Sequence, residues 1–251
     1  ACYPAKIVHG HIENLLTKNV DFIFYPNMPF NFIEKEHRDN EYNCPVVAFY
    51  PEVVGANMDN LNLDTFYMPY VTLNNKKAFI NNIKTAFNGK LPHRKSELSK
   101  AFDKGMKAYI DYKEEVINEG QRALDYALEH NKNLILLAGR PYHVDPEIHH
   151  GIPTLLRTLG CVVVSEDSLN TFADQKKVNV LNQWTYHTRL YDSAKYISNF
   201  KNANLVQLIS FGCGLDAITS DEVKEILQKN GKLYIQKHID TFGSLKNSHL
   251  I

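Results

Sequence analysis

The sequence has little of what marks several common classes of protein. Its 251 residues carry 28 Lys and Arg against 28 Asp and Glu, so the strong positive field on which nucleic-acid-binding proteins rely is absent. No apolar run reaches the roughly 20 residues of a membrane-spanning helix. The N-terminus lacks the charged and then apolar layout of a signal peptide. We therefore expect a cytoplasmic protein that binds neither nucleic acid nor membrane.

Cysteine is also scarce, with four residues that lie far apart and form no CxxC pair. This is not the dense spacing of a disulfide scaffold, so we expect the thiols to stay reduced. Cys161 opens a run of valines, which indicates a place in the core. Cys2, Cys44 and Cys213 each adjoin a proline or a glycine at the boundary of an expected element. At such boundaries a sulfur atom can face a cleft instead of the core.

The apolar segments alternate between the spacing of strands and that of helices, which predicts α/β lobes with parallel sheets. We expect two Rossmann-like or flavodoxin-like lobes, at 1–92 and 132–251, joined by a long helical connector at 93–131. Gly105 and Gly120 are places where the connector could bend or break. Strands are expected at 20–27, 44–51, 66–71, 133–139, 161–165, 206–209 and 232–239, and further helices at 4–16, 76–87, 145–156, 184–200 and 216–229.

The segment around Cys213 has the pattern strand, tight turn, cysteine, helix. Gly212 and Gly214 flank the cysteine and keep bulky side chains away from its sulfur. The helix that follows favours negative charge at its N-terminus, which would lower the pKa of the thiol and stabilise a bound anion. The pattern therefore predicts a ligand or a nucleophile. The alternative is a small buried residue in a glycine-rich turn.

A second candidate site follows the strand expected at 133–139. Arg140 and His143 lie on the loop beyond its carboxyl end, which is where open α/β sheets bind their ligands. These two side chains could hold a phosphate or a thioester, and the alternative is a loop with a purely structural role. Three thiolates from Cys2, Cys44 and Cys213 could bind zinc or an iron–sulfur cluster, although their spacing alone does not decide between a metal site and core positions.

Five separated motifs occur in order along nearly the whole chain. They are Cys2-Tyr3-Pro4 with Lys6 and His9-Gly10-His11; Asp21-Phe22-Ile23-Phe24-Tyr25-Pro26; Asn43-Cys44-Pro45; Ala138-Gly139-Arg140-Pro141-Tyr142-His143 with Asp145-Pro146-Glu147-Ile148; and Ser210-Phe211-Gly212-Cys213-Gly214 with Asp216-Ala217. Together these motifs resemble the activase-related proteins of the 2-hydroxyacyl-CoA dehydratase system. The resemblance implies that the chain is one dehydratase-like section of a very long protein that also carries ATPase activator modules. Such modules, in the same polypeptide or in a partner chain, are the expected partners.

The resemblance also implies a cofactor and an activity. Related dehydratase subunits bind a 4Fe-4S cluster through three cysteines, and by similarity these are Cys2, Cys44 and Cys213. Asn27 stands where relatives often have a cysteine, which makes it a further candidate ligand. The implied activity is ATP-driven, low-potential electron transfer to a CoA thioester in anaerobic metabolism. The chain would be part of an ATP-dependent reductase or dehydratase activating system. Arg140 and His143 would hold the substrate.

The residues also leave a different class of function open. The chain could be a non-redox binding module with a cleft for a CoA ester or a nucleotide. It could equally be a scaffolding domain of a larger protein, with the cysteines as structural zinc ligands.

Overall fold

The computed structural model describes residues 2–33, 40–90, 94–169, 178–210 and 212–239. It is an α/β protein whose paired strands are all parallel, as the sequence predicts. The chain divides into two compact units. The first comprises Tyr3–Asp111 with Asn182–Thr185, and the second comprises Tyr112–Leu181 and Tyr186–Ile251 with Cys2.

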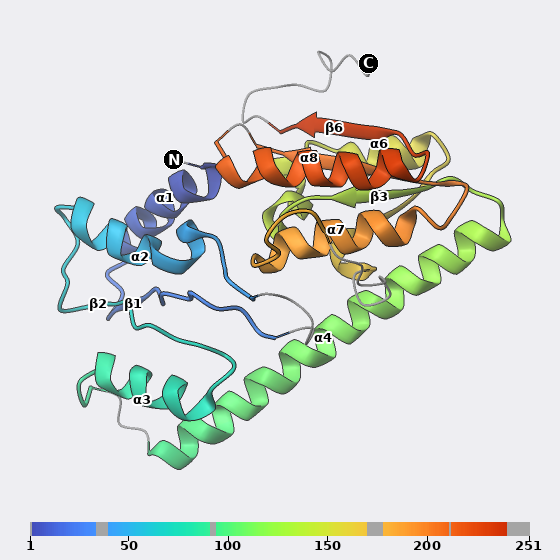
Figure 1. The fold of residues 1–251 in the computed structure, drawn as a ribbon. Coiled ribbons are helices and arrows are strands. Elements are labelled where there is room, and N and C mark those ends of the chain that lie inside the picture. Colours follow the sequence, from blue (N-terminus) through green and yellow to red (C-terminus); the bar gives the residue numbers. More distant parts are fainter. Residues whose placement is uncertain (1, 34–39, 91–93, 170–177, 211, 240–251) are drawn as a thin grey trace. The chain divides into compact units, whose positions relative to one another are not determined.

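The first unit contains a small parallel pair of strands and four helical segments (Figure 1). Strands β1 (Ile23–Phe24) and β2 (Phe66–Tyr67) pair in register, and an isolated parallel bridge joins Asn27 to Tyr70 further along. The helices are α1 (Tyr3–Thr17), α2 (Pro45–Asn57), α3 (Lys76–Ala86) and the first part of α4 (Lys95–Glu129). One apolar core of the unit gathers Ile12, Ile23, Val54, Met58, Leu61 and Phe66.

The strand expected at 44–51 is wrong, because these residues begin helix α2. Pro45 lies in the first turn, where its missing N–H costs no hydrogen bond. The buried residues Ala48, Pro51 and Val54 recur every three positions, which places them on one face of a helix. The flanking prolines suggested a strand with two ends, but here both prolines belong to the helix.

The second unit is built on a four-stranded parallel sheet in the order β4-β3-β5-β6. Its strands are β3 (Leu134–Ala138), β4 (Val162–Ser165), β5 (Ala203–Ile209) and β6 (Tyr234–His238). The connections contain the 3-10 turn η1 (Pro141–Val144), α5 (Pro146–His149), α6 (Ile152–Thr158), the 3-10 turn η2 (Glu166–Ser168), α7 (Thr185–Ile197) and α8 (Gly214–Lys229).

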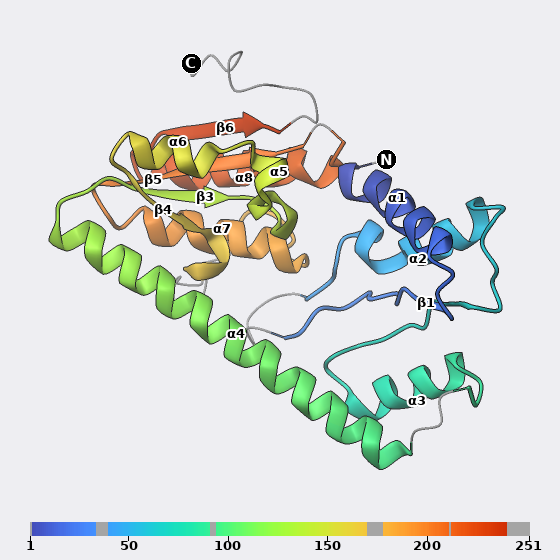
Figure 2. The same cartoon turned by 180° about the vertical axis from the view of Figure 1, so that it is seen from behind.

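Apolar side chains cover both faces of this sheet. On one face, residues of α7, α8 and the end of α4 pack with Leu136 and Leu205, both completely buried. On the other face, Ile152 of α6 packs against Leu137 and Leu208. Figures 1 and 2 show α7 and α8 on one side of the sheet and α6 on the other. All five residues of β3 are buried, as expected for a central strand of a doubly covered sheet.

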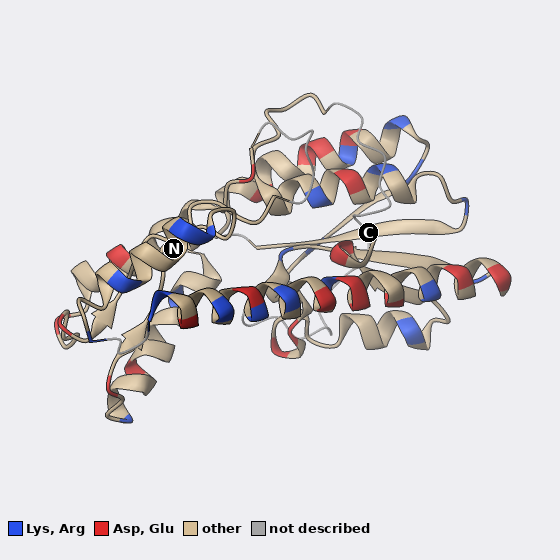
Figure 3. Cartoon of the chain, turned by 90° about the horizontal axis from the view of Figure 1, so that it is seen from below, with Lys and Arg blue, Asp and Glu red and all other residues tan. Residues whose placement is uncertain are grey.

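Helix α4 is continuous over its 35 residues and neither Gly105 nor Gly120 breaks it. Lysines and arginines alternate with acidic residues along its surface (Figure 3). The exposed pair Lys107 and Asp111, 2.7 Å apart, shows this i,i+4 pattern. The described helices include none that is both long and apolar enough to cross a membrane.

The helix expected at 145–156 is divided into α5, which ends at His149, and α6, which begins at Ile152. Asp145 caps the short α5 by accepting a hydrogen bond from the Glu147 N–H at 2.9 Å. His150 and Gly151 then adopt left-handed backbone angles. Pro153 lies in the first turn of α6, a position that suits proline.

Candidate functional site

The carboxyl edge of the four-stranded sheet contains the point at which the strand order reverses. From β3 the chain moves to β4 on one side, and it then returns to β5 on the other side. Open parallel sheets bind ligands at such a point. The segment after β3 carries Arg140 and His143, and the segment after β5 leads to Cys213. The fold therefore brings these three candidate residues to one edge of one sheet.

A buried ion pair connects the ends of the two central strands. The Arg140 guanidinium donates to Oδ1 of Asp216, in the first turn of α8. The second oxygen of Asp216 accepts a hydrogen bond from the Ser210 N–H at 3.2 Å. Burial lowers the pKa of Arg140, but the negative charge of Asp216, together with Cys213 and Tyr142, more than offsets this effect, so the net pKa lies above its usual value. Arg140 is therefore a fixed cation that already has a carboxylate partner.

His143 is held as a neutral imidazole. Its Nδ1 accepts a hydrogen bond from the Arg140 backbone N–H at 2.9 Å. Burial and the charge of Arg140 lower the pKa of His143 to about 3. Gly139 allows this arrangement, because a Cβ there would collide with Nδ1. Since Nδ1 is an acceptor, the ring proton resides on Nε2.

A cavity of about 190 Å³ opens beside these residues. Arg140, His143 and Glu166 are among the polar residues that line it. Glu166 is the first residue after β4, and burial and the nearby Asp167 raise its pKa to about 8 while Arg189 and Arg140 act in the opposite direction. The carboxyl group of Glu166 is therefore mostly protonated at neutral pH. The remaining lining residues are Leu137, Gly139, Val144, His149, Pro153, Val163, Val164, Ser165 and Leu208.

Cys213 is the N-cap residue of α8, as the sequence predicts, and its side chain is half-buried. Burial raises the pKa of its thiol above the usual value. The charge of Arg140 and the backbone N–H groups of Asp216 and Leu215 lower it, but only in part. The expected lowering at a helix N-terminus is thus outweighed by desolvation. The thiol nevertheless has a cationic neighbour and two N–H donors that would stabilise a negatively charged sulfur.

Cys44 and Asn27 lie in the first unit. Asn43, which precedes Cys44, is hydrogen-bonded to Met28, which follows Asn27. Cys44 is the N-cap of α2 and its side chain makes no capping hydrogen bond. Asn43 donates from Nδ2 to the Met28 carbonyl at 2.9 Å. Asn27 is fully buried and donates from Nδ2 to the Met68 carbonyl at 2.8 Å. Among the described residues, the Oδ1 atoms of both asparagines have no hydrogen-bond partner.

Cys2 immediately precedes α1 and is half-buried. Cys161 immediately precedes β4 and is half-buried, packed against the apolar cluster that contains Ile135 and Leu137. None of the four cysteines is in a disulfide bond. Over the described part of the chain, no three His, Cys, Asp or Glu side chains form a group that could hold a metal ion.

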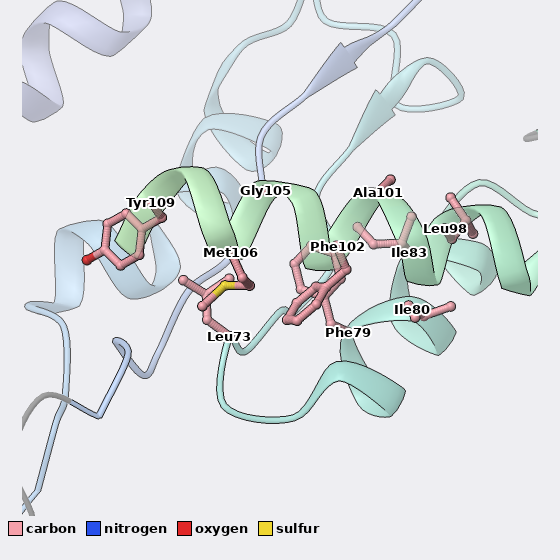
Figure 4. Close-up of a pocket in the computed structure, with 10 residues that line it drawn as sticks. All are labelled: Leu73, Phe79, Ile80, Ile83, Leu98, Ala101, Phe102, Gly105, Met106 and Tyr109. Atoms are coloured by element: carbon pink, nitrogen blue, oxygen red, sulfur yellow. The ribbon is translucent and has the colours of Figure 1, made fainter. Parts of the chain in front are cut away.

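A larger cavity, of about 410 Å³, lies between α3 and α4 in the first unit. Figure 4 shows Phe79 of α3 beside Phe102 of α4, and their ring centroids are 5.0 Å apart. Its lining is apolar apart from the Tyr109 hydroxyl: Leu73, Phe79, Ile80, Ile83, Leu98, Ala101, Phe102, Gly105, Met106 and Tyr109. Binding sites combine apolar walls with several polar groups that orient the ligand. The sheet edge of the second unit meets that description and this cavity does not.

The sequence interpretation missed Glu166. A signal was present, since Glu166 is the first charged residue beyond the carboxyl end of β4, an apolar strand that neighbours β3. The ion pair between Arg140 and Asp216 was missed as well, because 76 positions separate the two residues.

The fold and the site define an α/β protein with a parallel sheet that is covered on both faces. The polar residues of its candidate site lie at the carboxyl edge of this sheet. The model of a family described as CoA enzyme activase uncharacterised domain (DUF2229) matches residues 1–169. The chain belongs to this family, which agrees with the activase resemblance of its motifs. No curated protein and no solved structure matches the chain.

Proposed function

We propose that this chain is the iron–sulfur-binding, dehydratase-like domain of a CoA enzyme activase system. In this proposal an ATPase activator, in the same polypeptide or in a partner chain, supplies low-potential electrons that reach a CoA thioester. One observation carries the proposal. Cys2, Cys44 and Cys213 are free, half-buried thiols, and each immediately precedes the first residue of a helix.

The local surroundings of these cysteines suit metal-bound thiolates. Sulfur ligands of an anionic cluster are stabilised by N–H donors and by nearby positive charge. Cys213 has N–H groups of Leu215 and Asp216 and the charge of Arg140 beside it. Cys44 has an open capping position at the start of α2.

Asn27 is the proposed additional ligand. Its amide nitrogen is engaged by the Met68 carbonyl, which leaves Oδ1 as the atom able to donate electrons to a metal ion. A 4Fe-4S cluster bound by these residues would supply one-electron reduction. Arg140 and His143 would orient the substrate, and the apolar residues around them would exclude water.

Metal analysis tests this proposal directly. Protein prepared without oxygen should contain about four iron and four sulfide per chain, with visible absorption that dithionite bleaches. Cys213→Ser should lose most of this iron because it removes a ligand. Cys161→Ser is the matched control and should retain it, since Cys161 packs in the core. An iron-free wild-type protein, or equal iron contents in the two variants, would refute the ligand assignment.

The polar residues that line the cavity also support the second candidate function, a non-redox module in which this cavity would hold only one end of a CoA ester or a nucleotide. This alternative predicts that iron-free protein is stabilised by such a ligand in a thermal unfolding experiment. Zinc in the purified protein, without ligand-dependent stabilisation, would instead support a scaffolding domain.

A further inference from the structure

Two residues that line the small cavity of the second unit carry buried hydrogen-bond donors for which the described residues supply no acceptor. His143 is only 2% exposed. Its Nδ1 is occupied by the Arg140 N–H, so Nε2 must carry the proton. Within the described residues neither this Nε2 nor the Nε of Arg140 has a hydrogen-bond partner, and both atoms are buried. Buried N–H groups without acceptors are rare in folded proteins, and each requires an explanation.

The walls of the cavity restrict the chemistry of an acceptor that could fill it. Arg140, His143 and Glu166 are polar residues of its lining, while Leu137, Val163 and Leu208 contribute apolar surface. At ~30 Å³ of liquid volume per water molecule, 190 Å³ corresponds to about six non-hydrogen atoms. A ligand of this size would combine a polar acceptor head with a short alkyl chain.

A carboxylate fits these donors better than a single carbonyl. Its two oxygens offer about four acceptor positions, enough for the His143 N–H, the Arg140 N–H and a protonated Glu166. A thioester carbonyl offers one oxygen, so a thioester substrate oriented by Arg140 and His143 would use only part of this donor set. Asp216 compensates the charge of Arg140 only through the guanidinium terminus, so Nε remains as a charge-assisted donor.

We propose that the cavity bounded by Arg140, His143 and Glu166 is a binding site for a free short-chain carboxylate. The head of the ligand accepts hydrogen bonds from His143 Nε2 and Arg140 Nε, and its alkyl chain contacts the apolar wall. Glu166 in its protonated form donates a further hydrogen bond to the head. This site goes beyond the proposed function, because it requires neither a cluster nor CoA.

The pH dependence of binding follows from the groups that face Glu166. Asp167 favours its protonated form, whereas Arg189 and Arg140 favour its ionised form, and His143 and His149 also line the cavity. As the pH rises through about 8, Glu166 ionises and repels a bound carboxylate. Between pH 7 and pH 9 the affinity should therefore fall about tenfold. Glu166→Gln cannot ionise and should keep its affinity at pH 9.

Calorimetric titration of the whole, iron-free chain with sodium butyrate tests the proposal. The wild type should bind one butyrate per chain at pH 7, and His143→Phe should weaken binding about tenfold or more because the donor is lost. His150→Asn is the control and should bind as the wild type does. His150 is exposed and has a left-handed backbone that asparagine tolerates.

Each possible result decides the assignment. Absence of butyrate binding by the wild type, or unchanged binding by His143→Phe, overturns it. Binding of butyryl-CoA without binding of butyrate overturns the free carboxylate as the ligand.

Should circular dichroism show that His143→Phe is unfolded, the pH dependence of butyrate binding by Glu166→Gln decides. A profile parallel to that of the wild type refutes the site, and a flat profile supports it. Iron content is measured separately, so failure of the cluster proposal leaves this test intact.

Discussion

At the residue scale, Glu166 makes the stability of the protein depend on pH. Its pKa is about 8 in the folded protein, against an ordinary value near 4.3. Between these two values the folded state binds a proton that the unfolded state has released. The free energy of unfolding therefore decreases as the pH rises through this range. The protonated carboxyl is tolerated in its buried position, whereas the ionised carboxylate destabilises the fold.

Glu166→Gln should remove this pH dependence. Relative to the variant, the wild type should lose about 3 kcal/mol of unfolding free energy between pH 5.5 and pH 7.5. Urea denaturation at both pH values measures this difference. Exposed Glu114→Gln provides the control and should show the wild-type profile. Parallel profiles for the wild type and Glu166→Gln would mean that Glu166 is not protonated in the fold.

The sequence predicted where Arg140 and His143 lie more accurately than it predicted their interactions and the pKa values of the site. Arg140 and His143 could be located from the sequence, because a buried strand followed by polar residues marks the carboxyl edge of a sheet. The residues that interact with them could not be identified from the sequence. Asp216 and Glu166 reach the same edge only through the strand order of the sheet, and their electrostatic effects depend on burial. The sign of the Cys213 pKa shift was mistaken for the same reason.

At the element scale, helix α4 contains two glycines in opposite surroundings. A Cβ on Gly105 would meet no atom within 4 Å, whereas one on Gly120 would lie 2.5 Å from the Ser168 carbonyl oxygen. Gly105→Ala should stabilise the protein by about 1 kcal/mol through its higher helix propensity. Gly120→Ala should destabilise it by ~1–3 kcal/mol, since backbone atoms must move.

The two alanine variants serve as each other's control, because both add one methyl group to the same helix. Thermal denaturation should show shifts of opposite sign. Shifts of the same sign would contradict the close packing of Gly120 against η2. The result would also show whether glycine is required at position 120 because of close packing, and not because the helix bends there.

Element types were predictable wherever periodicity and length agreed. The patterns of α1, α3 and α8 have clear helical spacing, and those of β3 and β4 are short apolar runs. The failure at α2 arose because Val46 and Val47 suit a strand when they are considered locally. The helix was favoured there by the contacts of Val54 with the core of the first unit, and such contacts are not visible in a local window.

At the scale of the whole molecule, the two units differ in how their sheets are protected. The central strands β3 and β5 are hydrogen-bonded to neighbours on both sides, and apolar layers cover both faces of their sheet. Strands β1 and β2 pair over only two residues each. Local opening should therefore be least frequent in the four-stranded sheet.

Amide hydrogen exchange of the full chain checks this expectation. The amides of Leu136 and Leu205 should be among the slowest to exchange, and those of Tyr25 and Ile23 should exchange at least tenfold faster. Rates are compared at one pH after correction for the intrinsic rate of each amide. Equal protection of the two sheets would show that the first unit is as stable as the second.

The alternation of strands and helices thus indicated the α/β class and the long helix α4. It did not indicate that the described sheet of the first unit is so small. Sequence patterns report the tendency of a segment to form a strand, whereas the length of a strand depends on the partner with which it pairs. The family match agrees with the motifs over residues 1–169.

Arg140 belongs to two networks at once. Its backbone N–H fixes the ring of His143, and its guanidinium is paired with the α8 carboxylate, three residues beyond Cys213. A ligand that changes the position of Arg140 therefore changes the surroundings of the imidazole and of the sulfur together. Thermodynamic linkage makes such coupling reciprocal. If an occupant of the cavity changes the free energy of ligand binding at Cys213, then binding at Cys213 changes the free energy of binding in the cavity by the same amount.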